Sequence, residues 1–70
     1  MEEKSKKFKK LAENRTNQVL NTLRLLGNLS NRANYNYTEE EVDKIFSEIE
    51  RKTKETKVKF HFSKKYEFKL

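Results

Sequence analysis

The residues best suited to binding chemistry lie in the stretch 28–38, Asn-Leu-Ser-Asn-Arg-Ala-Asn-Tyr-Asn-Tyr-Thr. It combines four Asn, one Arg and two Tyr, a mixture that neither hydrophobic burial nor a tight turn requires. Amides donate and accept hydrogen bonds, and a guanidinium group binds phosphate or carboxylate through two parallel bonds. A tyrosine ring stacks on a base or fills a partner's pocket. The stretch therefore indicates a surface that binds a polar target such as nucleic acid or a ribonucleoprotein.

The same chemistry extends backwards along one face of an expected helix, at Asn17, Asn21, Arg24 and Asn28. Asn costs up to ~0.7 kcal/mol relative to Ala inside a helix, so helix stability does not explain this row of residues. A solvated face in a protein from an AT-rich genome is the alternative explanation. The candidate partner-binding or nucleic-acid-binding residues are Asn17, Asn21, Arg24, Asn28, Asn31, Arg32, Asn34 and Tyr35.

Catalytic and metal sites find little support in the sequence. The chain has no Cys and a single His, His61, which has no recognisable nucleophile or acid partner. The Glu residues cluster where capping of a helix explains them. One His and scattered Glu do not give the ligand spacing of a metal site. We expect a protein that is not an enzyme, with no catalytic residue, no metal and no cofactor.

Length and charge set further limits. Seventy residues form one domain, and 33% hydrophobic residues make a marginal core that a homodimer or a larger partner would help to bury. The net charge of +6 is distributed in blocks: +5 over residues 1–37, −5 over 38–50 and +6 over 51–70. Positive regions of this kind attract phosphates or acidic surfaces. No apolar run reaches membrane-spanning length and no signal peptide is recognisable, so we expect a cytoplasmic protein without a membrane.

The elements that position these residues follow from hydrophobic periodicity. Apolar residues recur at helical spacing in the first half and again from Val42, which predicts two amphipathic helices. The fold class expected for the single domain 1–70 is mainly α, a helical hairpin with a short C-terminal extended segment or β-hairpin. We expect a helix over about 5–26, a connector over 27–37, a helix over about 38–56, and the extended segment or hairpin over 57–70.

Local signals define the ends of these helices. Gly27 is predicted to end the first helix as a left-handed cap. Thr38 is predicted to cap the second, with Glu41 as its capping-box partner and Tyr37 and Val42 forming a hydrophobic staple. Tyr37 therefore has a structural role. Tyr35 has no such role and is the better candidate for base stacking or for insertion into a partner's pocket.

The C-terminal segment has two interpretations. Val58, Phe60 and Phe62 alternate with polar residues, as do Tyr66, Phe68 and Leu70, which is typical of a β-hairpin. Alternatively the helix continues through Phe60 and an extended tail folds back over it. Either arrangement uses these aromatic residues as core.

A resemblance to a protein group runs through the middle of the chain. Its core is the segment 27–32, Gly-Asn-Leu-Ser-Asn-Arg, and it also includes 14–17, Leu25-Leu26, Asn34-Tyr35, Tyr37-Thr38, Val42, 44–46 and 55–57. Over roughly residues 13–60 the chain resembles small uncharacterised basic proteins of mobile elements and phages in low-GC bacteria. By size, charge and source, these are similar to anti-CRISPR proteins, including those proposed against type VI-A nucleases. The resemblance implies a non-enzymatic inhibitor that docks on a CRISPR effector nuclease or its guide RNA complex.

Two functional hypotheses follow. The first is that inhibitor, whose connector and basic face occupy a guide or target channel. The second is a small dimeric regulator of a plasmid or phage that binds RNA or DNA directly, with the helical hairpin doubled into a four-helix bundle. Binding to naked nucleic acid with steep salt dependence favours the second hypothesis.

Overall fold

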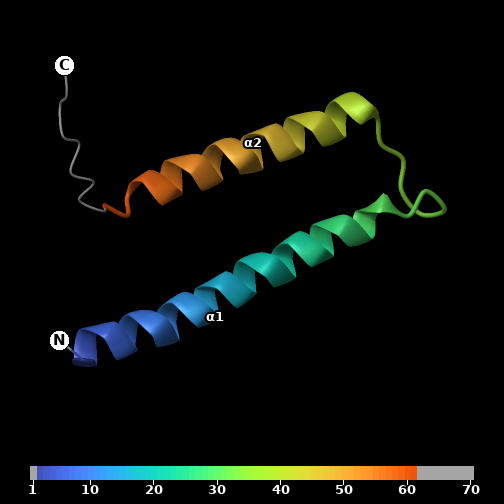
Figure 1. The fold of residues 1–70 in the computed structure, drawn as a ribbon. Coiled ribbons are helices and arrows are strands. Elements are labelled where there is room, and N and C mark those ends of the chain that lie inside the picture. Colours follow the sequence, from blue (N-terminus) through green and yellow to red (C-terminus); the bar gives the residue numbers. More distant parts are fainter. Residues whose placement is uncertain (1, 62–70) are drawn as a thin grey trace, which may run out of the picture. The chain divides into compact units, whose positions relative to one another are not determined.

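A computed structural model describes residues 2–61 of the chain as two α-helices and one short 3-10 helix (Figure 1). Helix α1 runs Glu2–Gly27, the 3-10 helix η1 runs Asn28–Ser30, and α2 runs Glu39–Val58. The predicted mainly α fold with two amphipathic helices is confirmed. The chain divides into two compact units, Met1–Asn36 and Tyr37–Leu70.

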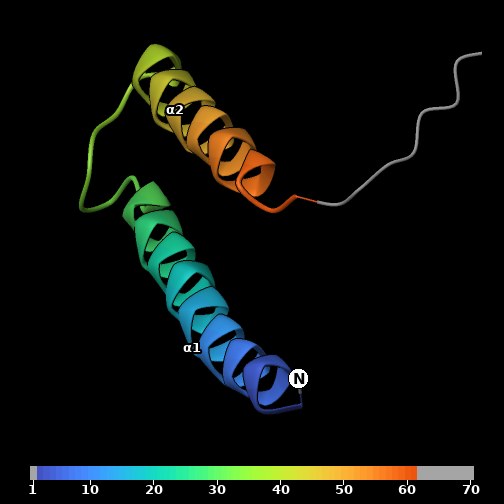
Figure 2. The same cartoon turned by 90° about the vertical axis from the view of Figure 1, so that its left-hand side faces the viewer.

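Helix α1 is a single uninterrupted element in the first unit (Figure 2). It extends to Glu2, the first described residue and three residues before the predicted start, and Glu2 and Glu3 place negative charge in the first turn, where the helix dipole favours it. Ala12, Leu23 and Leu26 are half-buried, and all three belong to the predicted apolar stripe.

The prediction for Gly27 was wrong. Its backbone has φ −61° and ψ −28°, so it is right-handed and belongs to α1. The chain passes directly into η1, and its direction changes only at Asn31, where φ is −70° and ψ is 102°. Since the turn is delayed by one 3-10 turn, nothing at position 27 requires the left-handed conformation that favours glycine.

The start of α2 agrees with its sequence signal. The Thr38 hydroxyl oxygen accepts a hydrogen bond from the Glu41 backbone N–H at 3.1 Å, and a Glu41 carboxylate oxygen accepts one from the Thr38 N–H at 2.9 Å. This is the predicted capping box. Tyr37 and Val42, the two residues of the predicted staple, are both half-buried.

The end of α2 differs from the prediction, because the helix continues to Val58, two residues beyond the expected end. The Thr53 and Thr56 hydroxyls donate to the carbonyls of Ile49 and Lys52, so both threonines satisfy their hydrogen bonds inside the helix. Val58 therefore does not begin a strand, and no strand occurs in residues 2–61. The rest of the predicted β-hairpin, residues 62–70, lies outside the described residues.

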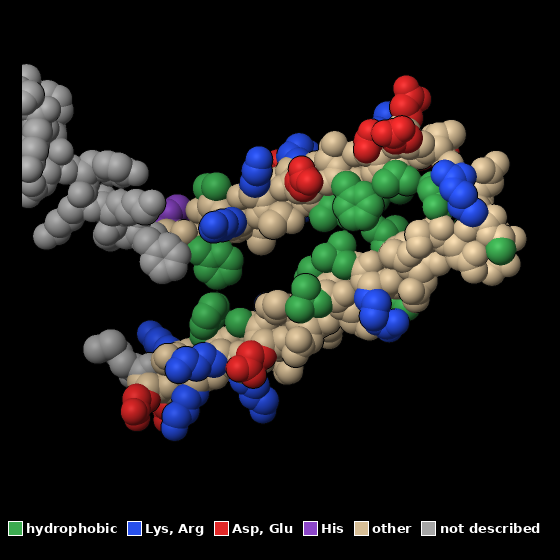
Figure 3. All heavy atoms as spheres, turned by 45° about the vertical axis from the view of Figure 1, so that its right-hand side comes forward, with side chains coloured by type: hydrophobic (Ala, Val, Ile, Leu, Met, Phe, Trp, Pro, Cys, Tyr) green, Lys and Arg blue, Asp and Glu red, His purple; other side chains and the backbone are tan. Residues whose placement is uncertain are grey.

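Apolar side chains gather on one side of each helix (Figure 3), yet none of the described residues is buried. Phe46, which the periodicity assigns to a core, is 44% exposed, and Phe8 is 57% exposed. The expected core is therefore not formed by the described residues. Each helix instead presents an apolar stripe that is at best half-covered.

Replacing Thr38 with Ala removes the acceptor for the Glu41 N–H. We expect a loss of about 0.5–2 kcal/mol in the free energy of unfolding, since N-cap substitutions of this kind cost that amount. Urea titration followed by circular dichroism measures it. Thr53→Ala is the matched control: it removes a hydroxyl bonded within the helix and improves helix propensity, so stability should stay equal or rise. Equal losses in both variants would contradict the role of the cap.

Candidate nucleic-acid interface

The polar face of α1 carries three of the candidate binding residues, Asn17, Asn21 and Arg24. Their spacings of four and three residues place them on one side of the helix. The half-buried Ala12, Leu23 and Leu26 lie near the opposite side, at the same 3.6-residue period. All three candidate side chains are exposed, so α1 presents its amides and guanidinium group to solvent.

Arg24 is oriented by Asn21. The Arg24 Nε and Nη2 atoms both donate to the Asn21 side-chain oxygen, at 3.3 and 2.9 Å. This amide oxygen positions the guanidinium group but carries no negative charge. No carboxylate of the described residues pairs with Arg24. As far as residues 2–61 go, Arg24 presents a positive charge that an amide orients and no carboxylate neutralises, which suits a phosphate or a carboxylate ligand.

The connector after η1 folds into a turn anchored on Asn31. The Asn31 carbonyl oxygen accepts hydrogen bonds from the N–H groups of Asn34 at 3.1 Å and Tyr35 at 3.0 Å. The Asn31 side-chain oxygen accepts a third from the Ala33 N–H at 3.0 Å. This is the local bonding by which Asn stabilises turns. Asn31, proposed from the sequence as a contact residue, thus also has a structural role.

The turn presents the remaining candidates. Arg32 and Asn34 lie within it and Tyr35 closes it, and all three are exposed. Tyr35 is 48% exposed, which leaves much of its ring available for stacking. Asn28, at the start of η1, is exposed as well. The structure therefore places all eight candidate residues at the surface of the unit Met1–Asn36, between positions 17 and 35.

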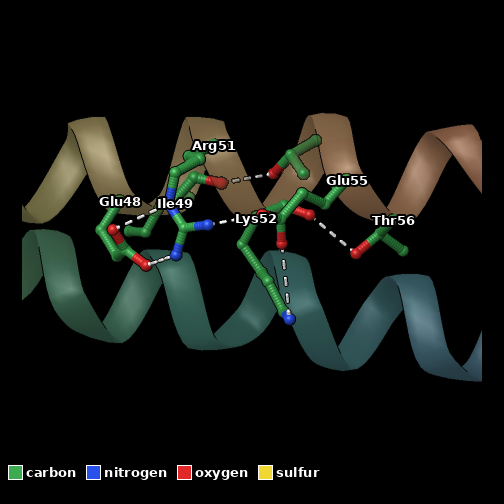
Figure 4. Close-up of polar contacts among 7 residues, drawn as sticks. Glu48, Ile49, Arg51, Lys52, Glu55 and Thr56 are labelled. Carbon is green, nitrogen blue, oxygen red and sulfur yellow. Dashed lines mark hydrogen bonds and ion pairs between the residues drawn. The ribbon is translucent and has the colours of Figure 1, made fainter.

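Arg51 on α2 has a different environment (Figure 4). Its guanidinium group binds the Glu48 carboxylate one turn before it and the Glu55 carboxylate one turn after it, and Lys52 pairs with Glu55 at 3.7 Å. The hydrogen bond from Arg51 is the main cause that lowers the pKa of Glu48, and the same bond raises the pKa of Arg51. Two carboxylates thus compensate this arginine, which distinguishes it from Arg24.

Charged side chains gather at the two helix starts. On the face shown in Figure 3, Lys side chains gather over the first turns of α1 together with Glu side chains, and Asp and Glu side chains gather over the first turns of α2. The basic group consists of Lys4, Lys6, Lys7, Lys9 and Lys10, all exposed. The acidic group consists of Glu39, Glu40, Glu41 and Asp43, also exposed. Acidic residues suit the positive end of a helix, and the first turn of α1 holds Glu2 and Glu3, whereas four of the five lysines lie beyond that turn.

His61 is exposed, and residues 2–61 contain no group of His, Asp or Glu that could hold a metal ion. Neither α1 nor α2 combines the length and the apolar character that crossing a bilayer demands.

Two features of the surface were not predicted from the sequence. The first is the set of ion pairs of Arg51. The sequence contained the signal for them, since Glu48, Arg51 and Glu55 have the three- and four-residue spacings of helical ion pairs. The second is the turn anchored on Asn31, which had only a weak signal, because the stretch holds four Asn and the sequence does not say which one closes a turn.

Comparison of the chain with protein-family models, with curated proteins and with solved structures finds no match.

Replacing Arg51 with Gln should return the pKa of Glu48 upward to its ordinary range, because the hydrogen bond that lowers it is lost. In the native chain the pair stabilises α2 above the ordinary carboxyl pKa, and this contribution is lost as pH falls through the lowered pKa of Glu48. The variant should lack that pH-dependent step in helix content. NMR titration of the side-chain carboxyl carbons measures the pKa of Glu48, and circular dichroism over the same pH range measures helix content. Lys54→Gln, on the same helix, should leave the titration of Glu48 unchanged; an equal change there would contradict the assignment to Arg51.

Proposed function

We propose that this chain is a small, non-enzymatic nucleic-acid-binding protein of a phage or other mobile element, acting in the cytoplasm. The surface at residues 17–35 of the unit Met1–Asn36 is its contact region. The observation that supports this most directly is Arg24, exposed, held by an amide and uncompensated by any carboxylate of the described residues.

Each residue type on this surface would contribute a different interaction to binding. Arg24 and Arg32 provide positive charge for the phosphate backbone, whose contacts dominate affinity. The amides of Asn17, Asn21 and Asn28 can hydrogen-bond sugars, phosphates or base edges. Tyr35 provides an exposed ring for an unpaired base. Single-stranded RNA or DNA offers both an unpaired base and a repeating phosphate backbone, so it is the ligand that these residues suit.

A second candidate function is an inhibitor that docks on an RNA-guided nuclease complex, of the anti-CRISPR type. A specific observation favours it: Tyr35 ends a turn closed by three hydrogen bonds to Asn31. A rigid aromatic residue on a fixed turn is a typical anchor for a protein pocket. Direct binding ranks first because it follows from the described side chains, whereas the inhibitor also needs the sequence resemblance.

One binding experiment separates the two functions. The protein is titrated into fluorescent single-stranded RNA, single-stranded DNA and a purified type VI-A nuclease loaded with guide RNA, each at several salt concentrations. Binding to the naked strands with a steep loss of affinity at higher salt supports direct binding. Binding to the loaded nuclease alone supports the inhibitor. Absence of binding to all three targets would overturn both.

Arg24→Ala should weaken binding to every strand sequence and lower the slope of log affinity against log salt by about 1, the effect of losing one phosphate contact. Fluorescence anisotropy over a salt series measures the slope. Arg51→Ala is the matched control, because it removes the same charge from an arginine already paired with two carboxylates. Equal changes in slope for the two variants would show that net charge alone drives binding and would contradict the assigned surface.

Tyr35→Ala should weaken binding by roughly 5- to 150-fold, since base–aromatic stacking contributes about 1–3 kcal/mol per base. Tyr35→Phe keeps the ring and should retain most of the affinity. The same anisotropy titration, run at one low salt concentration, compares the two variants. If Tyr35→Ala binds as well as the native chain, Tyr35 does not stack on a base.

A further inference from the structure

The polar face of α1 continues beyond the candidate residues toward the start of the helix. Residues three or four positions apart lie on one side of a helix. Counting back from Arg24 in such steps passes Asn21 and Asn17 and then reaches the first turns of α1. At 3.6 residues per turn, the residues met on this path fall within about 80° of the helix circumference. We call them the polar row, and they are Lys6, Lys10, Asn14, Asn17, Asn21 and Arg24.

The polar row contains neither an acidic nor an apolar residue. All six side chains are exposed, and the half-buried Ala12 and Leu23 lie toward the opposite side of α1. Glu3 lies on the same line one turn before Lys6, and Glu13 lies just beside the row. Within residues 2–61, neither of these carboxylates forms an ion pair with a lysine. The positive charges of the row are therefore not paired within α1.

The face of α2 opposite its apolar stripe is different, because it mixes both signs of charge. Arg51 lies on this face and binds the carboxylates of Glu48 and Glu55. Pairs of this kind, three or four residues apart, stabilise a helix that is surrounded by water. The polar row offers no such pairs, and its three Asn residues disfavour the helix. Helix stability thus explains the polar face of α2 but does not explain the row on α1.

The length of the row suits a strand of nucleic acid that lies along the helix. Lys6 and Arg24 are separated by roughly 27 Å along the axis of α1, at 1.5 Å per residue. A stacked strand advances about 3.4 Å per nucleotide, so the row matches roughly eight nucleotides. The row has two ammonium groups at one end, a guanidinium group at the other and amides between them. Charged ends suit phosphates, and the amides suit sugars and base edges.

We propose that a single strand of RNA or DNA lies lengthwise along α1, with Lys6 and Lys10 binding its phosphates at the end remote from Arg24. Asn14 then belongs to the amides that contact the middle of this strand. The inference rests on the proposed nucleic-acid binding and extends its contact region from residues 17–35 to the first turns of α1.

The double variant Lys6→Gln with Lys10→Gln tests the extension. Gln has nearly the same helix propensity as Lys, so α1 should keep its helix content, which circular dichroism measures. The probes are fluorescent oligouridine RNA and oligothymidine DNA of about 12 nucleotides, longer than the row. Anisotropy over a salt series should show the slope of log affinity against log salt reduced by about 1.4, at about 0.7 per phosphate contact on a single strand.

The matched control is Lys4→Gln with Lys9→Gln. It removes the same charge from the same end of α1, at two positions that lie nearer to the apolar stripe than to the polar row. Its slope should stay close to that of the native chain. Equal changes of slope in the two double variants would assign the effect to net charge and overturn the extension.

NMR spectra of the Asn side-chain amides locate the strand directly. On addition of the same oligonucleotides, the signals of Asn14 and Asn17 should shift together. A shift of Asn17 without Asn14 would end the contact region at position 17 and overturn the extension.

Failure of the extension differs from failure of the proposed function. If Arg24→Ala lowers the slope while Lys6→Gln with Lys10→Gln leaves it native, the strand binds but does not reach the first turns of α1. If the native chain binds neither oligonucleotide, direct binding and its extension both fail.

Discussion

Uncovered apolar surface is the constraint on which the rest of this structure depends. Each helix places its apolar residues on one side, but none of the described residues is buried. Burial of apolar surface is the main source of tertiary stability, and helices of 26 and 20 residues gain only part of theirs from local interactions. The capping box at Thr38 and the ion pairs of Arg51 stabilise α2 locally. These local interactions leave the apolar side of each helix at best half-covered among the described residues.

Arg24 and Arg51 show that residue type alone does not define a binding site. Arg51 pairs with two carboxylates on its own helix and holds the pKa of Glu48 below its usual range. Within residues 2–61, Arg24 bonds to an amide oxygen, from Asn21, and to no carboxylate. The difference comes from neighbours three and four residues away, Asn in one case and Glu in the other. A phosphate ligand would therefore displace two carboxylates at Arg51 but none of the described carboxylates at Arg24.

Much of the fold was predictable because its signals are local. The two helices follow from 3.6-residue periodicity, and the start of α2 follows from Thr38 and Glu41, which satisfy each other's hydrogen bonds over three residues. The ends were less predictable. Gly27 permits a left-handed cap but does not impose one, and the threonines near the end of α2 bond to the preceding turn and so continue the helix. The exposure of the eight candidate residues agrees with a binding role, which remains a proposal.

By itself, the sequence determined the helix class, the capped start of α2, the block charges and the row of amides on α1, since each depends on residues within a turn or two of one another. Only the tertiary structure decided which groups are already occupied. Among the described residues, it closed the connector on Asn31, oriented the Arg24 guanidinium group on Asn21 and left Phe46 44% exposed. These outcomes depend on side-chain conformations and on which surfaces meet. Several arrangements of the same residues satisfy the local rules, and a one-dimensional pattern does not choose among them.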